Sequence, residues 1–498
     1  MHPKTILLLF MQNENVKPSL LISIIPLLTL IGLLSFSYSQ FGSNVSDGSS
    51  QIVLLTATAV ASVLAICFCK VKWETIEKAM CQNILSVSGA LLMLFLIGSL
   101  SGIWMVSGVV PTMIYYGVQL LNPDFFLCSC CVICAVVSVV IGSSYTTIAT
   151  IGVALMGIGK IQGFPASWIA GAIISGAYFG DKVSPLSDTT VLAASITNTP
   201  IFSHIRFMQN TTVPTMALAL VLFAMLSYGH SAVELNSVQE LLQALDGTFV
   251  ITPWLLLVPV VTFLLIMRKM PTLVILFVGI LLACVCGLVL QPGLLVGVAE
   301  GGNVFKGLLM VLYGDTNIET GNVILNDLVT THGMSGMMNT VWLTMCAMCF
   351  GGAMQSTGML ECITRYFLKL ISGGVSLVAS TVFSGILFNI IAAEQYISII
   401  LTGNMFKDVY KEKGYESKLL SRTVEDGVTV TSVLIPWNGC GMVQASILGV
   451  PTIAYLPYCF FNLLNPFVSI LVMAVGFQLR SVCRFPMLMV RKVAQRVR

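Results

Sequence analysis

Long apolar runs separated by short polar loops fill almost the whole chain. About 20 consecutive apolar residues cross the hydrocarbon layer as a helix, which satisfies its own backbone hydrogen bonds there. Several of the runs are too short to cross alone. The candidate spans are Pro18 to Tyr38, Ile52 to Cys69, Ile84 to Met105, Phe125 to Ile141, Thr146 to Gly159, Ser167 to Phe179, Pro214 to Tyr228, Phe249 to Met267, Thr272 to Leu290, Thr340 to Gln355, Val375 to Ile391, Tyr396 to Lys407, Leu419 to Leu434 and Ile453 to Gly476.

Several of these spans are short and interrupted by Gly or Pro. Such segments, at corresponding positions of a chain's two halves, indicate broken helices around a transporter's binding site. The pattern predicts an all-α polytopic membrane protein, and more specifically an inverted-repeat secondary transporter with broken or re-entrant helices. Composition agrees, because 56% of the residues are hydrophobic and 9% are charged, whereas about 25% are charged in a soluble protein.

The two halves of the chain match one another at a constant offset of 251 residues. The matches gather around two polar segments, which favours a repeat over the chance similarity expected in so apolar a chain. The matched pairs are Tyr145 with Tyr396, Ile148 with Ile399, Gly152 with Gly403, Pro185 with Pro436, Ala194 with Ala445, Ser195 with Ser446, Ile196 with Ile447 and Pro200 with Pro451. Basic residues flank opposite ends of corresponding spans, which predicts inverted orientation and a site at the repeat interface.

This repeat, together with the basic loops, predicts the organisation of the chain. The expected parts are an N-terminal pair of transmembrane helices at 1–80, a first transporter repeat at 81–230, linking helices and an outer loop at 231–330, a second repeat at 331–479 and a basic cytoplasmic tail at 480–498. Lys and Arg gather in a few short loops, as cytoplasmic loops do, and they place both termini in the cytoplasm.

Charge and cysteine content exclude several other classes of protein. A net charge of +3 is too small to indicate nucleic-acid binding. The 15 cysteines lie mostly within apolar runs, and we expect small buried side chains rather than disulfides or metal ligands. The motifs of a P-loop NTPase, a zinc protease and an α/β-hydrolase do not occur in a convincing context. We therefore expect no enzyme.

Asp188 lies in a polar segment that apolar spans enclose. A charged side chain near the bilayer centre costs roughly 2.5 to 3.5 kcal/mol on insertion scales, so a carboxylate here indicates a function. Pro185 removes a helical hydrogen bond, and the freed carbonyl and hydroxyl oxygens are hard ligands for a small cation. Burial disfavours the charged carboxylate and a bound cation favours it, so Asp188 can hold either a proton or sodium. The alternative is that Asp188 is a helix N-cap.

Further residues complete the predicted cation site. Ser187, Thr189, Thr190 and Asn438 are the assisting ligands, and Asn438 comes from the segment of the second half that corresponds to this one. Asp181, Glu394 and Glu425 are additional candidates.

Each additional candidate has a plainer alternative. Asp181 precedes Lys182, so the two could form a salt bridge or a membrane-edge turn. Glu394 could be an extracellular turn residue. Glu425 could belong to a cytoplasmic vestibule or start a solvated helix. No Arg is evident among the core helices to bind an organic acid.

Three blocks of sequence carry these polar residues. The first reads GDKVSPLSDTT within Ser175 to Pro200; the second comprises Ser421 to Asp426, Pro436 to Gly441 and Leu448 to Pro451; the third comprises Glu394 to Tyr396 with Gly403. Together they resemble the NhaC family of bacterial sodium/proton antiporters. Val191 departs from the family pattern, since it stands where Asn is common, and this removes one possible ligand.

The resemblance implies exchange of Na+ for H+ across the bacterial inner membrane by alternating access, without ATP or another cofactor. Sodium ions and protons are the implied substrates, and the lipid bilayer surrounds the protein. The resemblance leaves open whether the protein forms a homodimer. Family members that couple organic acids such as malate and lactate give the first alternative. An integral membrane enzyme or a channel is the alternative from a different class.

Overall fold

The regular structure is helical throughout the part of the chain that the computed structural model describes, which comprises residues 18–41, 48–228, 235–268, 270–320, 322, 325–326, 329–369 and 371–476. One isolated bridge joins Thr316 to Thr331. Within these ranges nine helices are long and apolar enough to cross a membrane, and two bent helix pairs raise the number to 11. The prediction of an all-α polytopic membrane protein is confirmed. The expected tail at 480–498 lies outside the described ranges.

The helices of the two halves follow one another in the same order. Several stretches begin 251 positions before their counterparts, as the sequence offset predicts. The matching elements are α5 (Ser88–Val106) with α19 (Met338–Ser356), α6 (Val109–Leu120) with α20 (Met359–Lys369), α7 (Phe126–Ile141) with α21 (Gly374–Ala392), α8 (Ser144–Thr147), η3 (Ile148–Gly152) and α9 (Val153–Ile161) with α22 (Gln395–Glu412), α10 (Ala166–Val183) with α23 (Ser417–Val424), η6 (Glu425–Thr429) and η7 (Ser432–Leu434), α11 (Asp188–Ile196) with α24 (Gly439–Leu448), and α12 (Ile201–Tyr228) with α25 (Thr452–Tyr455), η8 (Leu456–Tyr458) and α26 (Phe460–Ala474).

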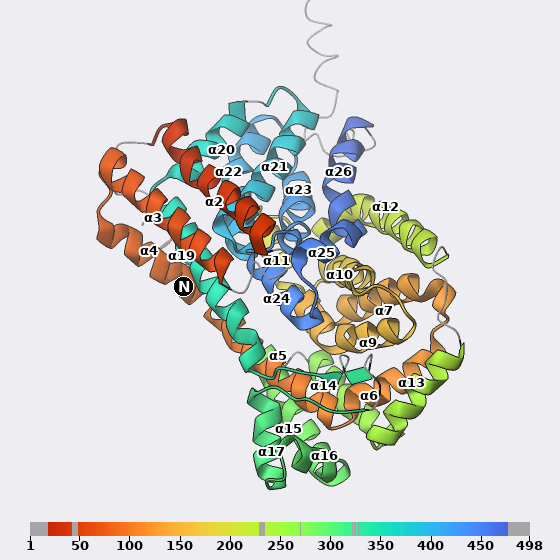
Figure 1. Ribbon diagram of the computed structural model, residues 1–498. Coiled ribbons are helices and arrows are strands. Elements are labelled where there is room, and N and C mark those ends of the chain that lie inside the picture. Colours follow the sequence, from red (N-terminus) through yellow and green to blue (C-terminus); the bar gives the residue numbers. More distant parts are fainter. Residues whose placement is uncertain are drawn as a thin grey trace, which may run out of the picture.

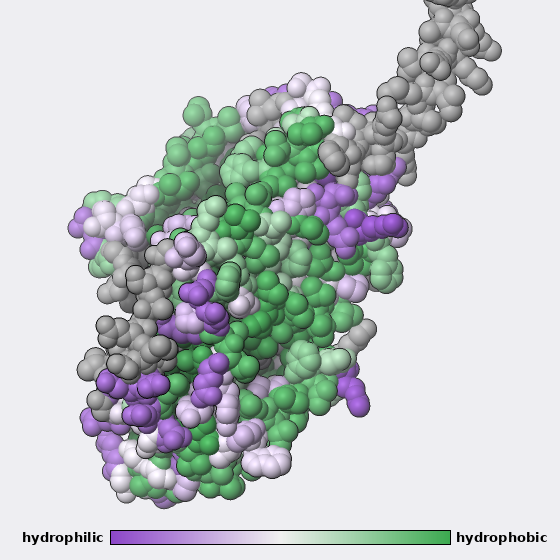
Figure 2. Space-filling model, turned by 90° about the vertical axis from the view of Figure 1, so that its right-hand side faces the viewer, coloured by the Kyte–Doolittle hydropathy of each residue, from purple (hydrophilic) through white to green (hydrophobic). Residues whose placement is uncertain are grey.

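Helices outside these pairs lie at two edges of the molecule (Figure 1). On one side α3 (Ser49–Cys69) and α4 (Trp73–Ser86) pack with α19, and α2 (Leu20–Phe41) packs with α3 and α20. The linking helices lie at one end: α13 (Leu235–Thr248), η4 (Pro253–Leu256), α14 (Leu257–Met267), α15 (Thr272–Leu290), α16 (Pro292–Val298) and α17 (Val304–Tyr313). Two short turns, η2 (Pro123–Phe125) and η5 (Ser335–Met337), precede α7 and α19. Apolar side chains cover most of the face in Figure 2, which suits contact with lipid.

Both halves break their helices at equivalent points. Gly142 after α7 and Ala393 after α21 adopt the left-handed conformation, with φ of 73° and 55°. Ser143 and Glu394 follow in extended conformation, and each caps the next helix with its side chain. A Cβ on Gly142 would lie 2.7 Å from the carbonyl carbon of Leu186. The break after α7 is therefore packed closely against the chain between α10 and α11.

Helix α10 is held deep in the molecule by close packing on α7. A Cβ on Gly176 would overlap the carbonyl oxygen of Cys131, and one on Gly180 would overlap that of Ala135. Glycines four residues apart let two backbones approach closely, as in many membrane-helix pairs. This packing fixes the C-terminal end of α10, where Asp181 and Lys182 lie.

Candidate functional site

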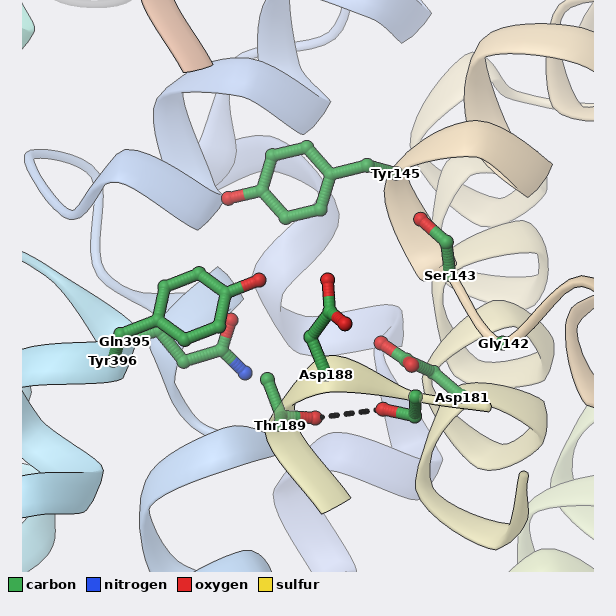
Figure 3. A pocket seen from close by; sticks show the side chains of 9 residues that line it. Gly142, Ser143, Tyr145, Asp181, Asp188, Thr189, Gln395 and Tyr396 are labelled. Carbon is green, nitrogen blue, oxygen red and sulfur yellow. Dashed lines mark hydrogen bonds between the residues drawn. The ribbon is translucent and has the colours of Figure 1, made fainter. Parts of the chain in front are cut away.

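A small polar pocket lies where the broken helices of the two halves meet. Its volume is about 30 Å³, room for roughly two water-sized particles. Residues from the starts of α8 and α11 and the end of α10 face the start of α22 (Figure 3). The lining residues are Gly142, Ser143, Tyr145, Asp181, Ser187, Asp188, Thr189, Gln395 and Tyr396.

The chain between α10 and α11 presents Asp188 to this pocket. Pro185 has no backbone N–H, so the helix cannot continue through it, and Ser187 is extended with φ of −70° and ψ of 128°. The Ser187 hydroxyl accepts a hydrogen bond from the Thr190 backbone N–H at 3.4 Å. Ser187 is thus the N-cap, and Asp188 is the first residue of α11. The alternative that Asp188 itself is the N-cap is wrong, because the N-cap is Ser187, one residue earlier.

The two carboxyl groups of the pocket differ in their surroundings. Asp181 has an exposed fraction of 6%, and Ser144 Oγ donates a hydrogen bond to its Oδ2 at 2.8 Å. Asp188, which we expected to be closed off, is exposed and points between Tyr145 and Tyr396. Asp181 therefore forms the inner wall of the pocket and Asp188 its open side.

Hydroxyl groups supply further oxygen atoms beside the carboxylates. Ser187 Oγ and Thr189 Oγ1 are 3.0 Å apart and both residues line the pocket. Thr190 does not line it. Its hydroxyl donates to the carbonyl oxygens of Lys182 at 3.1 Å and Asp181 at 3.4 Å, so it joins α11 to the end of α10.

The second half contributes Gln395 and Tyr396, which the sequence did not single out as ligands. The one available signal was the offset that pairs Tyr396 with Tyr145. Tyr145 Oη donates to Cys440 Sγ at 3.2 Å, and Cys440 Sγ donates to Gln395 Oε1 at 3.0 Å. These contacts connect the two pocket walls. Asn438 lies outside the lining and accepts a hydrogen bond from the Cys440 backbone N–H at 3.0 Å, so it positions this link.

Glu394 lies beside the pocket rather than in it. It lies in the turn between α21 and α22, as its alternative expected, and its exposed fraction there is 8%. Its Oε2 accepts a hydrogen bond from the Ile397 backbone N–H at 2.7 Å. Glu394 is therefore the N-cap of α22 and orients Gln395 and Tyr396.

A second polar cluster, the buried charge cluster, lies on the other side of α10 and is formed by Lys182, Arg422, Glu425 and Asp426. All four side chains are 0% or 1% exposed. Lys182 Nζ is hydrogen-bonded to Asp426 Oδ1, and Arg422 Nε lies 3.4 Å from Asp426 Oδ2. Lys182 thus pairs with Asp426 from the other half, and not with its neighbour Asp181.

Neutral donors complete the contacts of Asp426. Thr211 Oγ1 donates to its Oδ1 at 3.1 Å, and Asn465 Nδ2 donates to the same oxygen at 3.0 Å. Helices α10, α12, α23 and α26 therefore converge on one carboxylate. The expectation that no Arg is buried among the core helices is wrong. Arg422 is buried because Asp426 lies one helical turn away and supplies its counter-ion.

The pocket has the chemistry of a site for a small hard cation. Carboxylate and hydroxyl oxygens are the ligands that such cations prefer. Two carboxylates beside one another also bind protons, because like charges disfavour double ionisation. A proton and a metal ion therefore compete for the same oxygens.

Comparisons with known proteins agree with this chemistry. The sequence model of the Na+/H+ antiporter family matches residues 176–477. The Na(+)/H(+) antiporter NhaC of Bacillus subtilis is 37% identical, over 85% of this chain and 91% of that protein. NhaC of Alkalihalophilus pseudofirmus is 37% identical, over 84% and 89%. The malate-2H(+)/Na(+)-lactate antiporter of Bacillus subtilis is 33% identical, over 89% and 92%.

The family match includes the buried charge cluster and most of the pocket. It begins before Asp181 and extends past Asn465, so the pocket residues of α10, α11 and α22 and the whole buried charge cluster fall within it. These relatives are transporters by name, and they match this chain over most of their length. The chain therefore belongs to the NhaC family of Na+/H+ antiporters.

Proposed function

We propose that this protein is a secondary antiporter that exchanges Na+ for H+ across the bacterial inner membrane by alternating access, with both termini in the cytoplasm. The observation that carries the proposal is the pair of carboxyl groups, Asp181 and Asp188, in one small polar pocket between the two halves. The ion gradients supply the driving free energy, so no cofactor is needed.

In the proposed cycle, a sodium ion and a proton exclude one another from the pocket. A sodium ion exchanges part of its water shell for oxygens of Asp188, Asp181, Ser187 and Thr189. One of the two carboxyl groups keeps a proton while sodium is bound, so the charge of sodium balances the other carboxylate. On the proton-rich side a second proton binds that carboxylate and releases sodium, so the pocket itself exchanges one proton for one sodium ion. Only an occupied and neutralised pocket moves between the two sides, because an empty one would carry bare negative charge through a low-dielectric region.

Asp188 is the entry ligand in this proposal and Asp181 the inner one. Asp188 lies at the start of α11, where the helix dipole favours negative charge, and it faces the open side of the pocket. Asp181 is buried and has its position fixed by Ser144. Gln395 and Tyr396 are the groups of the second half that close on the ion.

The test is Na+-dependent proton movement in everted membrane vesicles, followed with a pH-sensitive dye. We expect addition of Na+ to dissipate the pH gradient for the wild type. Asp188→Asn should abolish this response while the protein still inserts, because the amide neither binds a proton nor balances the charge of sodium. Glu361→Gln, which removes an exposed carboxylate that is 3.8 Å from Arg365, is the control and should behave as wild type. Exchange retained in Asp188→Asn would contradict the proposed role.

A second candidate is an exchanger that carries an organic acid together with these ions. The observation in its favour is a relative named as a malate-2H(+)/Na(+)-lactate antiporter. Against it stands the lining of the pocket, which has two carboxylates and, among the described residues, no Lys or Arg to bind a carboxylic acid. Arg422 is buried, but it faces Asp426 outside the pocket. Sodium-loaded proteoliposomes supplied with malate or lactate separate the two candidates, since only the second predicts acid uptake coupled to sodium release.

A further inference from the structure

Glu425 is a buried carboxyl group that the proposed exchange does not use. It lies in the π-helical segment η6, does not line the pocket, and is 0% exposed. Its side-chain neighbour is Thr429, and among the described residues no hydrogen bond of ordinary geometry reaches either of its side-chain oxygens. A charged group buried without a partner is far more costly than a neutral one. The geometry around Glu425 thus suits a carboxyl group that carries a proton.

The cations of the buried charge cluster are already paired elsewhere. Asp426 takes the Lys182 ammonium on one oxygen and faces the Arg422 guanidinium with the other. Glu425 precedes Asp426 in the chain and interacts electrostatically with Lys182. It is therefore the second carboxyl group within reach of the Lys182 charge, and it is the one left without a bonded cation.

Other charged and titratable groups face this region from each packed element. Helix α21 contributes the neutral Asn389, and α26 contributes the neutral Asn465. The charged or titratable groups are Asp181 and Lys182 of α10, His204 of α12, Tyr410 of α22, Arg422 of α23 and Asp426 of η6.

Helix α10 connects Glu425 to the pocket. Asp181 lines the pocket and Lys182, the next residue, reaches into the buried charge cluster. Glu425 interacts electrostatically with both. The Thr190 hydroxyl holds the carbonyl oxygens of both residues to α11. A change of charge in the pocket is therefore transmitted to Lys182 through one rigid turn of backbone.

We propose that Glu425 is a proton-binding site of its own, separate from the sodium pocket and coupled to it through Lys182. This inference rests on the proposed Na+/H+ exchange and deepens it. When sodium occupies the pocket, Lys182 turns from Asp426 to Glu425, and the Glu425 O–H bond breaks and its proton passes to water. In the return half-cycle Glu425 takes up a proton from the other side. Exchange then moves more than one proton for each sodium ion.

The proton count of the wild-type protein tests this directly. In proteoliposomes with set Na+ and H+ gradients, the membrane voltage at which net flux stops gives the ratio of protons to sodium ions. We expect a ratio above one and a current carried by the exchange. A ratio of one, with no response to voltage, would overturn the inference while leaving Na+/H+ exchange intact. Absence of any Na+-dependent proton flux would instead overturn the proposed function.

A matched set of variants assigns the additional proton to Glu425. Glu425→Gln should keep exchange of radioactive sodium for unlabelled sodium and should lower the proton-to-sodium ratio by one. Glu425→Asp, which retains the carboxyl group, should restore the wild-type ratio, and Glu361→Gln should leave it unchanged. An unchanged ratio in Glu425→Gln contradicts the inference. So does loss of sodium exchange in a monodisperse, folded Glu425→Gln protein, because Glu425 would then belong to the sodium path.

Discussion

Asp181 and Asp188 lie in one pocket but have different roles, because the groups in contact with them differ. Asp181 is 6% exposed and receives the Ser144 hydroxyl, whereas Asp188 is exposed at the first position of α11. A hydrogen bond to a charged group contributes about 1.5 to 3 kcal/mol. Ser144 therefore fixes the inner ligand, while free backbone N–H groups and the helix dipole favour the charge of the outer one.

The Ser144 contact gives a quantitative prediction. Ser144→Ala removes the hydroxyl that is 2.8 Å from Asp181 Oδ2, and we expect the half-saturating Na+ concentration to rise about tenfold or more, from the energy of one charge-assisted bond. Maximal exchange should change less. The measurement is a Na+ titration of proton flux in everted vesicles.

The control is a serine of the same chain that has no part in the pocket. Ser88 is exposed, and its hydroxyl donates a hydrogen bond to the Leu85 carbonyl oxygen three residues earlier. Ser88→Ala should leave the titration as in the wild type. A Ser144→Ala protein with unchanged Na+ dependence would show that Asp181 does not touch the ion.

At the scale of elements, three interrupted helices build the pocket. The breaks after α7 and α21 use a left-handed residue followed by an extended cap, and the break after α10 uses Pro185 and the Ser187 cap. Each break frees polar backbone groups where side chains of the other half can meet them. Ala393 shows that an alanine can take the left-handed conformation here, so at Gly142 the contact with Leu186 is the stronger constraint.

Gly142→Ala is expected to destabilise the protein. Left-handed conformation costs a non-glycine residue roughly 1 to 2 kcal/mol, and the added Cβ would meet the Leu186 carbonyl carbon at 2.7 Å. We expect a lower melting temperature in detergent and weaker exchange, because Leu186 must shift and carries Asp188 with it.

Gly32→Ala is the matched control for this prediction. Gly32 lies within α2, and a Cβ there meets nothing within 4 Å. Alanine is about 1 kcal/mol better than glycine inside a helix, so stability should be equal or slightly higher. Equal melting temperatures for Gly142→Ala and the wild type would show that the break is not closely packed in the membrane.

At the scale of the whole molecule, both polar clusters join the two halves. In the pocket Asp188 of the first half faces Tyr396 of the second. In the buried charge cluster Lys182 of the first half binds Asp426, 244 positions later. Breaking a buried ion pair by removing one partner typically costs 3 to 5 kcal/mol. Movement between the halves therefore has to exchange such partners rather than leave them unpaired.

Competition in the pocket predicts a pH dependence with a definite sign. A pocket that has taken up its protons cannot bind sodium, so the half-saturating Na+ concentration should rise as pH falls, by up to about tenfold per pH unit for each competing proton. At high pH it should level off, since the carboxyl groups are then ionised. Na+ titrations of sodium uptake at several pH values measure this. A half-saturating concentration that is independent of pH would mean that protons and sodium use separate sites only.

Several pocket residues could be predicted from the sequence because their signal is local. Asp181, Ser187, Asp188 and Thr189 are polar residues around a proline between apolar spans, and all four line the pocket. Asn438 shares this signal in the second half, but its side chain turns to Cys440 and to the Asn389 carbonyl oxygen instead. A cap and a ligand use the same residue types, so sequence alone does not separate them.

The sequence by itself determined that the protein lies in a membrane, where its helices run, that its two halves repeat and which family it belongs to. These properties depend on runs of apolar residues and on spacings along the chain. Only the tertiary structure decided which polar groups meet. Lys182 could have paired with Asp181 beside it, but one residue along a helix turns the side chain by about 100°, and close packing of α10 directs it to Asp426 instead. Partners far apart in the chain are chosen by packing, which leaves no local pattern.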